Sequence, residues 1–199
     1  MGTQALEILK TLDFKALSTQ LVMQCAPLIS GLKFSNLLTI SFDKLDDLNE
    51  LLKHTDICIY HLTETENRAY VLLYNESDLQ AYLNNQETKG FMQTLGYMSN
   101  DVAAVLPEFK RRYSNYMKTK CDFPHEMGIL LGYPLEDVVG FIVNEGKNFL
   151  CTGYWKVYKN ANEKQKIFRK YEMVRETMIH LISHGLRIEE IIDIYKMAA

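Results

Sequence analysis

One short pattern occurs twice in the second half of the chain, ten residues apart. The copies are Phe123-Pro124-His125-Glu126 and Tyr133-Pro134-Leu135-Glu136, each an aromatic residue, a proline, a variable residue and a glutamate. Proline suits the first position of a helix, and a carboxylate in the first turn interacts favourably with the positive end of the helix dipole. The pattern therefore predicts two short helices that begin at the prolines, are divided at Gly132 and end at Gly146.

Strand patterns are few and short in this chain. Apolar residues alternate over residues 36–42, and two further strand patterns, 57–62 and 69–74, flank a polar loop that predicts a β-hairpin. Residues 149–158 predict another strand, with Trp155 on its buried face and Lys156 on the opposite face. The sequence therefore predicts about four strands in one small sheet.

Helical spacing of apolar residues accounts for most of the remaining chain. It predicts helices over residues 4–24, 43–53, 76–83, 90–97 and 101–117, a proline- and glycine-containing turn at 25–33, and two more helices after the last strand. Seven or more helices and a β-hairpin correspond to an α+β fold in which helices cover a small mixed sheet. The length of 199 residues, with no linker or repeat, predicts a single globular domain over residues 1–199.

Charge and composition narrow the class of protein. The net charge of −3 argues against a nucleic-acid-binding protein, although residues 106–199 carry 15 Lys and Arg against 12 Asp and Glu. The apolar runs are too short to cross a membrane and the first residues lack the features of a signal peptide, so we expect a cytoplasmic protein without a membrane partner. The four cysteines contain no C-x-x-C pair, which predicts free thiols and no metal site.

Two candidate functional residues lie in the first copy of the proline pattern. His125 and Glu126 occupy a predicted helix N-terminus, where backbone N–H groups can receive an anion and a neutral imidazole can act as a base. Helix capping and packing explain the same two residues without any ligand. The pattern alone leaves both interpretations open.

The other candidates lie in the last predicted strand. Lys156 stands between Tyr154 and Tyr158 on one strand face, an arrangement that suits a carboxylate, a phosphate or a flat aromatic ligand. Cys151 would be a nucleophile if a base lay beside it. An ordinary solvent-facing strand and a buried thiol are the structural alternatives.

Three blocks of residues resemble the signatures of an uncharacterised bacterial family of unknown function, found mostly in anaerobes. The blocks are C-A-P-x3-G-x-K at residues 25–33, F-P-H-E-x-G-x2-L-G-Y-P-x-E-D-V-x-G-F at 123–141 and G-Y-W-K-V-Y at 153–158. Phe34 stands where members of that family usually carry a proline. The resemblance spans nearly the whole chain; it implies no particular activity or cofactor, and only an iron or redox context.

Three functions follow as hypotheses. The first is a binding protein for a small anionic or aromatic ligand or cofactor, with the ligand-binding residues Lys33, His125, Tyr154, Lys156 and Tyr158. We expect the three blocks to meet in one pocket with His125 and Lys156 pointing into it, which would favour this function, whereas the alternative is that each block fixes a junction of the fold by itself.

The second hypothesis is an enzyme that uses His125 and Glu126 with Cys151 as acid, base or nucleophile. The third is an adaptor that binds a protein partner through its basic C-terminal half. A deep pocket favours the first two functions, and a flat apolar patch without a pocket favours the third.

Overall fold

The centre of the fold is a three-stranded antiparallel sheet in the order β1-β3-β2. The computed structural model describes residues 3–198, with side chains for residues 6–197. The strands are β1 (Ser35–Ser41), β2 (Cys58–Glu64) and β3 (Arg68–Tyr74), and β2 and β3 form the predicted hairpin. The expectation of a mixed sheet is wrong, because both strand pairs are antiparallel.

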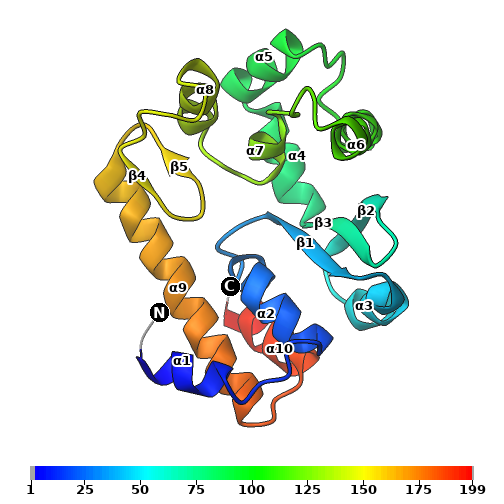
Figure 1. The fold of residues 1–199 in the computed structure, drawn as a ribbon, viewed down its shortest axis with the longest axis vertical. Helices are drawn as coiled ribbons and strands as arrows, with labels where there is room; N and C mark the ends of the chain where they lie inside the picture. Colours follow the sequence, from blue (N-terminus) through cyan, green and yellow to red (C-terminus); the bar gives the residue numbers. More distant parts are fainter. Residues whose placement is uncertain (1–2, 199) are drawn as a thin grey trace.

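Helices from the two ends of the chain cover one face of the sheet (Figure 1). They are α1 (Thr3–Leu9), α2 (Leu17–Ile29), α9 (Ala161–Ser183) and α10 (Ile188–Ala198). A 3-10 turn, η1 (Phe42–Lys44), leads from β1 into α3 (Leu45–Leu52), which joins the same core. Leu38 and Val71, which are partners in adjacent strands, are fully buried in this core.

The middle of the chain covers the other face. Its helices are α4 (Glu76–Asn84), α5 (Gln86–Thr94), α6 (Val102–Thr119), α7 (Met127–Leu130) and α8 (Leu135–Val143). Leu62 and Leu72 of the sheet are buried here with Phe109 of α6. The result is an α+β fold of ten α-helices within residues 3–198, with helices on both faces of the sheet.

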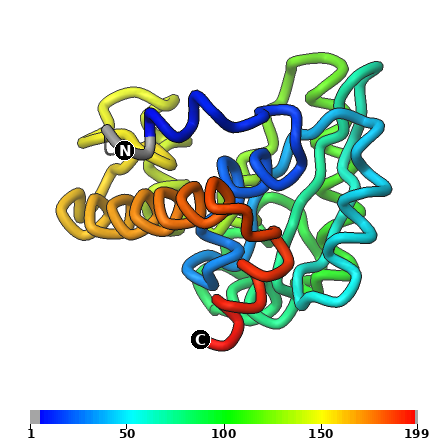
Figure 2. Tube along the Cα trace, turned by 90° about the horizontal axis from the view of Figure 1, so that it is seen from below, coloured from blue at the N-terminus to red at the C-terminus, as the bar shows by residue number. Residues whose placement is uncertain are grey.

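The segment 149–158 does not form a fourth strand of this sheet. It folds into a separate hairpin of two-residue strands, β4 (Cys151–Thr152) and β5 (Lys156–Val157), which lies beside the first half of α9 (Figure 2). Trp155 and Val157 are buried as expected, but against Phe168 and Tyr171 of α9. The prediction of one continuous strand is wrong because the chain turns back at residues 153–155, where the Gly153 N–H donates to the carbonyl of Trp155.

The N-terminal helical pattern divides differently from the prediction. The predicted helix 4–24 is two helices, and α2 continues to Ile29, so the turn expected at residues 25–33 begins later. Pro27 lies inside α2, although proline cannot donate the helical hydrogen bond. Cys25, Ala26 and Leu28 are all buried in the core, and this packing outweighs the local cost of the proline.

The two proline-containing segments form the expected pair of short helices, but both begin after their prolines. α7 has only four residues and begins at Met127, and α8 begins at Leu135. Gly132 separates them at a φ of +68°, where glycine is favoured, and the Tyr133 N–H donates to the Gly128 carbonyl at 2.8 Å. Gly128 allows close packing, since a methyl group there would lie 2.7 Å from Val138.

Candidate functional site

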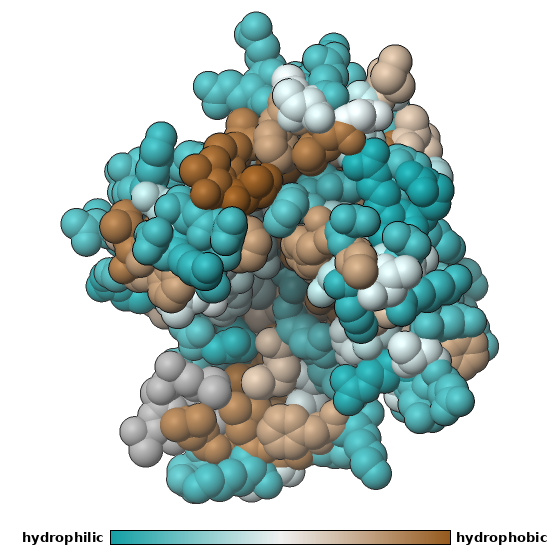
Figure 3. All heavy atoms as spheres, turned by 45° about the horizontal axis from the view of Figure 1, so that its top comes forward, coloured by the Kyte–Doolittle hydropathy of each residue, from teal (hydrophilic) through white to brown (hydrophobic). Residues whose placement is uncertain are grey.

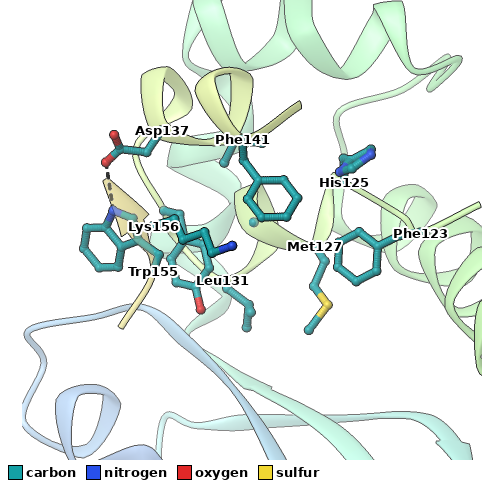
Figure 4. A pocket seen from close by; sticks show the side chains of 11 residues that line it. Phe123, His125, Met127, Leu131, Asp137, Phe141, Trp155 and Lys156 are labelled. Carbon is teal, nitrogen blue, oxygen red and sulfur yellow. Dashed lines mark hydrogen bonds between the residues drawn. The ribbon is translucent and has the colours of Figure 1, made fainter. Parts of the chain in front are cut away.

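A cavity of about 200 Å³ lies between the α7–α8 pair and the β4–β5 hairpin (Figure 4). We call it the ring pocket. Its walls are mostly apolar and aromatic, from Phe123, Met127, Leu131, Tyr133, Phe141 and Trp155. The polar side chains that line it are His125, Asp137 and Lys156. The second and third sequence blocks therefore meet in one cavity.

Lys156 brings a positive charge to this apolar cavity. Its Nζ donates to the Gly146 carbonyl at 2.7 Å and lies 5.6 Å from the ring centroid of Phe141 and 5.0 Å from that of Phe149. Among the residues whose side chains are described, no carboxylate forms an ion pair with it. Because an ammonium has three N–H donors, two remain for another acceptor.

His125 lies on the opposite side of the ring pocket from Lys156 (Figure 4). Its ring is packed edge-on to Phe123 at 5.4 Å and lies 6.0 Å from Phe141. Since His125 and Lys156 both flank the Phe141 ring, their separation cannot exceed the sum of their distances to it. That separation is within the span of one small ligand.

Asp137 holds the hairpin wall of the ring pocket in place. It is 2% exposed and accepts hydrogen bonds from Trp155 Nε1 at 2.8 Å, from the Tyr158 backbone N–H at 2.7 Å and from that of Lys159 at 3.2 Å. Its carboxylate is therefore fully used in fixing Trp155, whose ring stacks on Tyr133 at 5.1 Å. This role was not predicted from the sequence, because an acidic residue in a first helical turn already has a local explanation.

Glu126 points away from the ring pocket toward α6. Its Oε1 accepts from the Tyr97 hydroxyl at 3.0 Å and pairs with Arg112 at 3.4 Å, and the residue is 2% exposed. Burial, followed by the neighbouring Glu126 carboxylate, raises the pKa of Tyr97. Glu126 thus joins the turn before α7 to α6, with Arg112 also donating to the Leu95 carbonyl at 2.9 Å.

The first sequence block lies behind the ring pocket and does not line it. Lys33 Nζ is 5.2 Å from the Tyr133 ring centroid and donates to Asn36 Oδ1 at 3.0 Å. Burial lowers the pKa of Lys33 to about 8 and raises the pKa of Cys25 to about 12. The ring of Tyr133 lies between Lys33 and the cavity, so the structure brings two of the three blocks together there.

The remaining predicted site residues also lie outside the ring pocket. Tyr154 packs against Phe168 and Tyr171 of α9, at centroid distances of 5.7 and 5.0 Å, and burial raises its pKa to about 12. Tyr158 packs closely over Gly140 of α8. The expected arrangement of Lys156 between two phenols on one strand face is not found, because the segment is not a continuous strand.

The cysteines are Cys25, Cys58, Cys121 and Cys151, and all four are free. Cys151 is half-buried on β4 beside the Trp155 cluster and does not line the ring pocket.

No group of three or more His, Cys, Asp or Glu side chains within residues 6–197 is arranged to hold a metal ion. None of the helices described for residues 3–198 is long and apolar enough to span a membrane.

The fold and the cavity together define the structural class of this chain. It is an α+β protein in which a pair of short helices and a β-hairpin enclose a small aromatic pocket that contains one lysine. Residues 21–192 match the model of a family described as "Protein of unknown function (DUF3793)", so the chain belongs to that family. No curated protein and no solved structure matches the chain.

Proposed function

We propose that the chain is a binding protein for a small aromatic carboxylate, held in the ring pocket with its carboxylate on Lys156. The observation that carries this proposal is the Lys156 ammonium, which lies in an apolar cavity with one backbone acceptor and no carboxylate partner among the described side chains. A partly desolvated cation favours an anion, and the aromatic walls favour a flat apolar body.

The size of the cavity sets the size of the ligand. An apolar cavity of about 150 Å³ accommodates benzene, and the ring pocket offers about 200 Å³. One six-membered ring with a carboxylate corresponds to that volume. A haem or a flavin would be too large for it, so the iron or redox context suggested by the resemblance is no part of this proposal.

The enzyme hypothesis has less support. Glu126 is engaged by Tyr97 and Arg112, and Cys151 lies outside the cavity, so His125 has neither as a partner for acid–base or nucleophilic chemistry inside the pocket.

The adaptor hypothesis has one favourable observation. Val143 and Leu150 are 74% and 62% exposed. Figure 3 shows apolar side chains gathered beside a hollow on one face of the molecule.

Fluorescence titration tests the binding proposal directly. Trp155 is the single tryptophan of the chain and lines the ring pocket, so a bound ligand changes its emission. We expect benzoate to bind and its neutral counterparts, benzamide and benzyl alcohol, to bind at least about tenfold more weakly, since a charge-assisted hydrogen bond is stronger than a neutral one.

The decisive variant is Lys156→Met, which keeps the length of the side chain and removes the charge. We expect it to weaken benzoate binding by at least about tenfold, with little change in the binding of benzyl alcohol. Lys147→Met is the matched control, because Lys147 is a lysine between α8 and β4 whose side chain is 76% exposed, paired with Glu145 and outside the pocket. Equal benzoate affinity in wild type and Lys156→Met would refute the proposal.

A further inference from the structure

A second hollow adjoins the ring pocket. It has a volume of about 440 Å³ and shares Phe123 and His125 with the ring pocket, so these two side chains stand at the junction of both. We call it the polar pocket. Its remaining lining comes from Leu95 at the end of α5, from α6 and from the segment before α7, and includes Arg111, Arg112, Asn115, Asp122 and Glu126.

The two arginines of the polar pocket are already neutralised. Arg111 donates from both Nε and Nη2 to Glu108, at 2.8 and 2.7 Å. Arg112 donates to Glu108 at 2.7 Å and pairs with Glu126 at 3.4 Å. With Asp122 also in the lining, carboxylates at least match the guanidinium groups. The polar pocket therefore does not favour a second anion.

Two other side chains of the polar pocket offer free hydrogen-bonding groups. The Asn115 amide and the Asp122 carboxylate are exposed, and neither makes a side-chain hydrogen bond or ion pair to another described residue. Together they provide N–H donors and carbonyl and carboxylate acceptors. Such a mixed set suits a neutral group that both donates and accepts, such as an amide or a hydroxyl.

We propose that the ligand has two parts: an aromatic carboxylate in the ring pocket and a neutral, hydrogen-bonding tail in the polar pocket. The inference rests on the proposed function, because the ring carboxylate anchors the ligand at Lys156. Lys156 and His125 lie on opposite sides of the ring pocket (Figure 4), and His125 also lines the polar pocket. The tail therefore leaves the ring at the position opposite the carboxylate.

A set of substituted benzoates tests this geometry. The probes are benzoate, 4-acetamidobenzoate, its 3-substituted isomer, and a benzoate with a glucosyl group on a 4-hydroxyl, with binding followed by Trp155 fluorescence and calorimetry. We expect at least one 4-substituted probe to bind about tenfold more tightly than benzoate, the gain that one well-made hydrogen bond supplies. We expect the 3-substituted isomer to gain nothing. The acetamido and glucosyl probes distinguish an amide tail from a hydroxylated one.

The variants remove the groups that would hold the tail. They are Asn115→Ala and Asp122→Gly, alone and combined; glycine is chosen because Asp122 has a φ of +55°, which alanine adopts poorly. Lys118→Ala is the control, an exposed residue of α6 that does not line the polar pocket. We expect the combined variant to abolish the gain from the 4-substituent while benzoate affinity changes less than about twofold.

Each possible result either supports the two-part ligand or overturns it. A 4-substituted probe that binds better than benzoate, and loses that advantage in the combined variant, supports it. Benzoate binding without any gain from either tail, or a gain that survives the combined variant, overturns the inference and leaves the proposed function standing. If no probe binds, the proposed function fails and the two-part ligand fails with it. Thermal melts of each variant confirm that the comparison is made between folded proteins.

Discussion

The two copies of the aromatic-proline pattern share proline and glutamate at the same spacing but have different surroundings in the structure. Glu126 and Glu136 each lie two residues after a proline. Glu126 is buried against Tyr97 and Arg112 of the helical layer, whereas Glu136 remains about one-third exposed and pairs with Lys164 of α9 at 2.9 Å. In the second copy the buried carboxylate is the next residue, Asp137, which binds the β4–β5 hairpin.

The difference shows what a local pattern determines. Proline followed by an acidic residue predicts where a helix begins and that the first turn carries a negative charge. Tertiary partners determine which carboxylate is buried: Arg112 and Tyr97 in one copy, and Trp155 with two backbone N–H groups in the other. Both copies thereby contribute to the lining of the ring pocket, the first with Phe123 and His125 and the second with Tyr133.

The largest loss of stability is expected on replacing Trp155, which stacks on Tyr133 of the second copy. Trp155 is 8% exposed, stacks on Tyr133 and packs edge-on against Phe168 at 4.6 Å. Its replacement by alanine should lower the free energy of unfolding by about 3–5 kcal/mol, because a large buried aromatic leaves a cavity. Urea denaturation measures this loss, with Trp155→Phe as a milder control. A loss near zero would mean that the hairpin does not depend on this contact.

A smaller effect separates the two glutamates. Glu126→Ala should cost about 2–3 kcal/mol, because it leaves the buried Tyr97 hydroxyl without its acceptor and removes one of the two carboxylates that pair with Arg112. Glu136→Ala should cost less, about 1 kcal/mol, because Glu136 is itself one-third exposed and only Lys164, whose side chain is 10% exposed, loses a partner. Both values come from urea denaturation under the same conditions. Equal losses would contradict the account of why the two copies differ.

The smallest effect is a pH dependence at Glu108 of α6, which shares Arg112 with Glu126 of the first copy. Hydrogen bonds from Arg111 and then Arg112 lower the pKa of Glu108 from 4.5 to about 2. A carboxylate whose pKa is lowered by folding stabilises the protein fully above its unfolded pKa, so this contribution is lost as the pH falls from 4.5 toward 2. Glu108→Gln should flatten that part of the stability profile. An unchanged slope in the variant would show that these ion pairs contribute nothing to folding.

Much of the fold follows from local sequence. The β2–β3 hairpin was predicted because two strand patterns flank a polar loop, and α9 because apolar residues recur at helical spacing. Local sequence did not predict that residues 149–158 form a separate hairpin beside α9. Alternation placed Trp155 and Val157 correctly on a buried face, but periodicity cannot say whether that face meets a sheet or a helix. The extension of α2 through Pro27 likewise depends on burial that the local sequence does not reveal.

The candidate site was likewise predicted only in part, since local patterns identified some of its residues and tertiary packing determined the others. His125 and Lys156 were singled out from helix-start and strand patterns, and the structure places both at one cavity. Tyr154 and Tyr158 were grouped with Lys156 by strand alternation, and that grouping was lost when the strand became a hairpin. Met127 and Asp137 were not predicted as site residues, because a methionine and a first-turn aspartate are common in any helix. Their role arises from which elements pack together.

A crystal structure of the protein grown with 4-bromobenzoate tests the central claim most directly, since the anomalous signal of bromine locates the ring without ambiguity. The account predicts a carboxylate within hydrogen-bonding distance of Lys156 Nζ, the ring against Phe141, and the bromine directed toward His125 and the polar pocket. Bromine bound elsewhere on the molecule, or an empty ring pocket at saturating ligand, would contradict it.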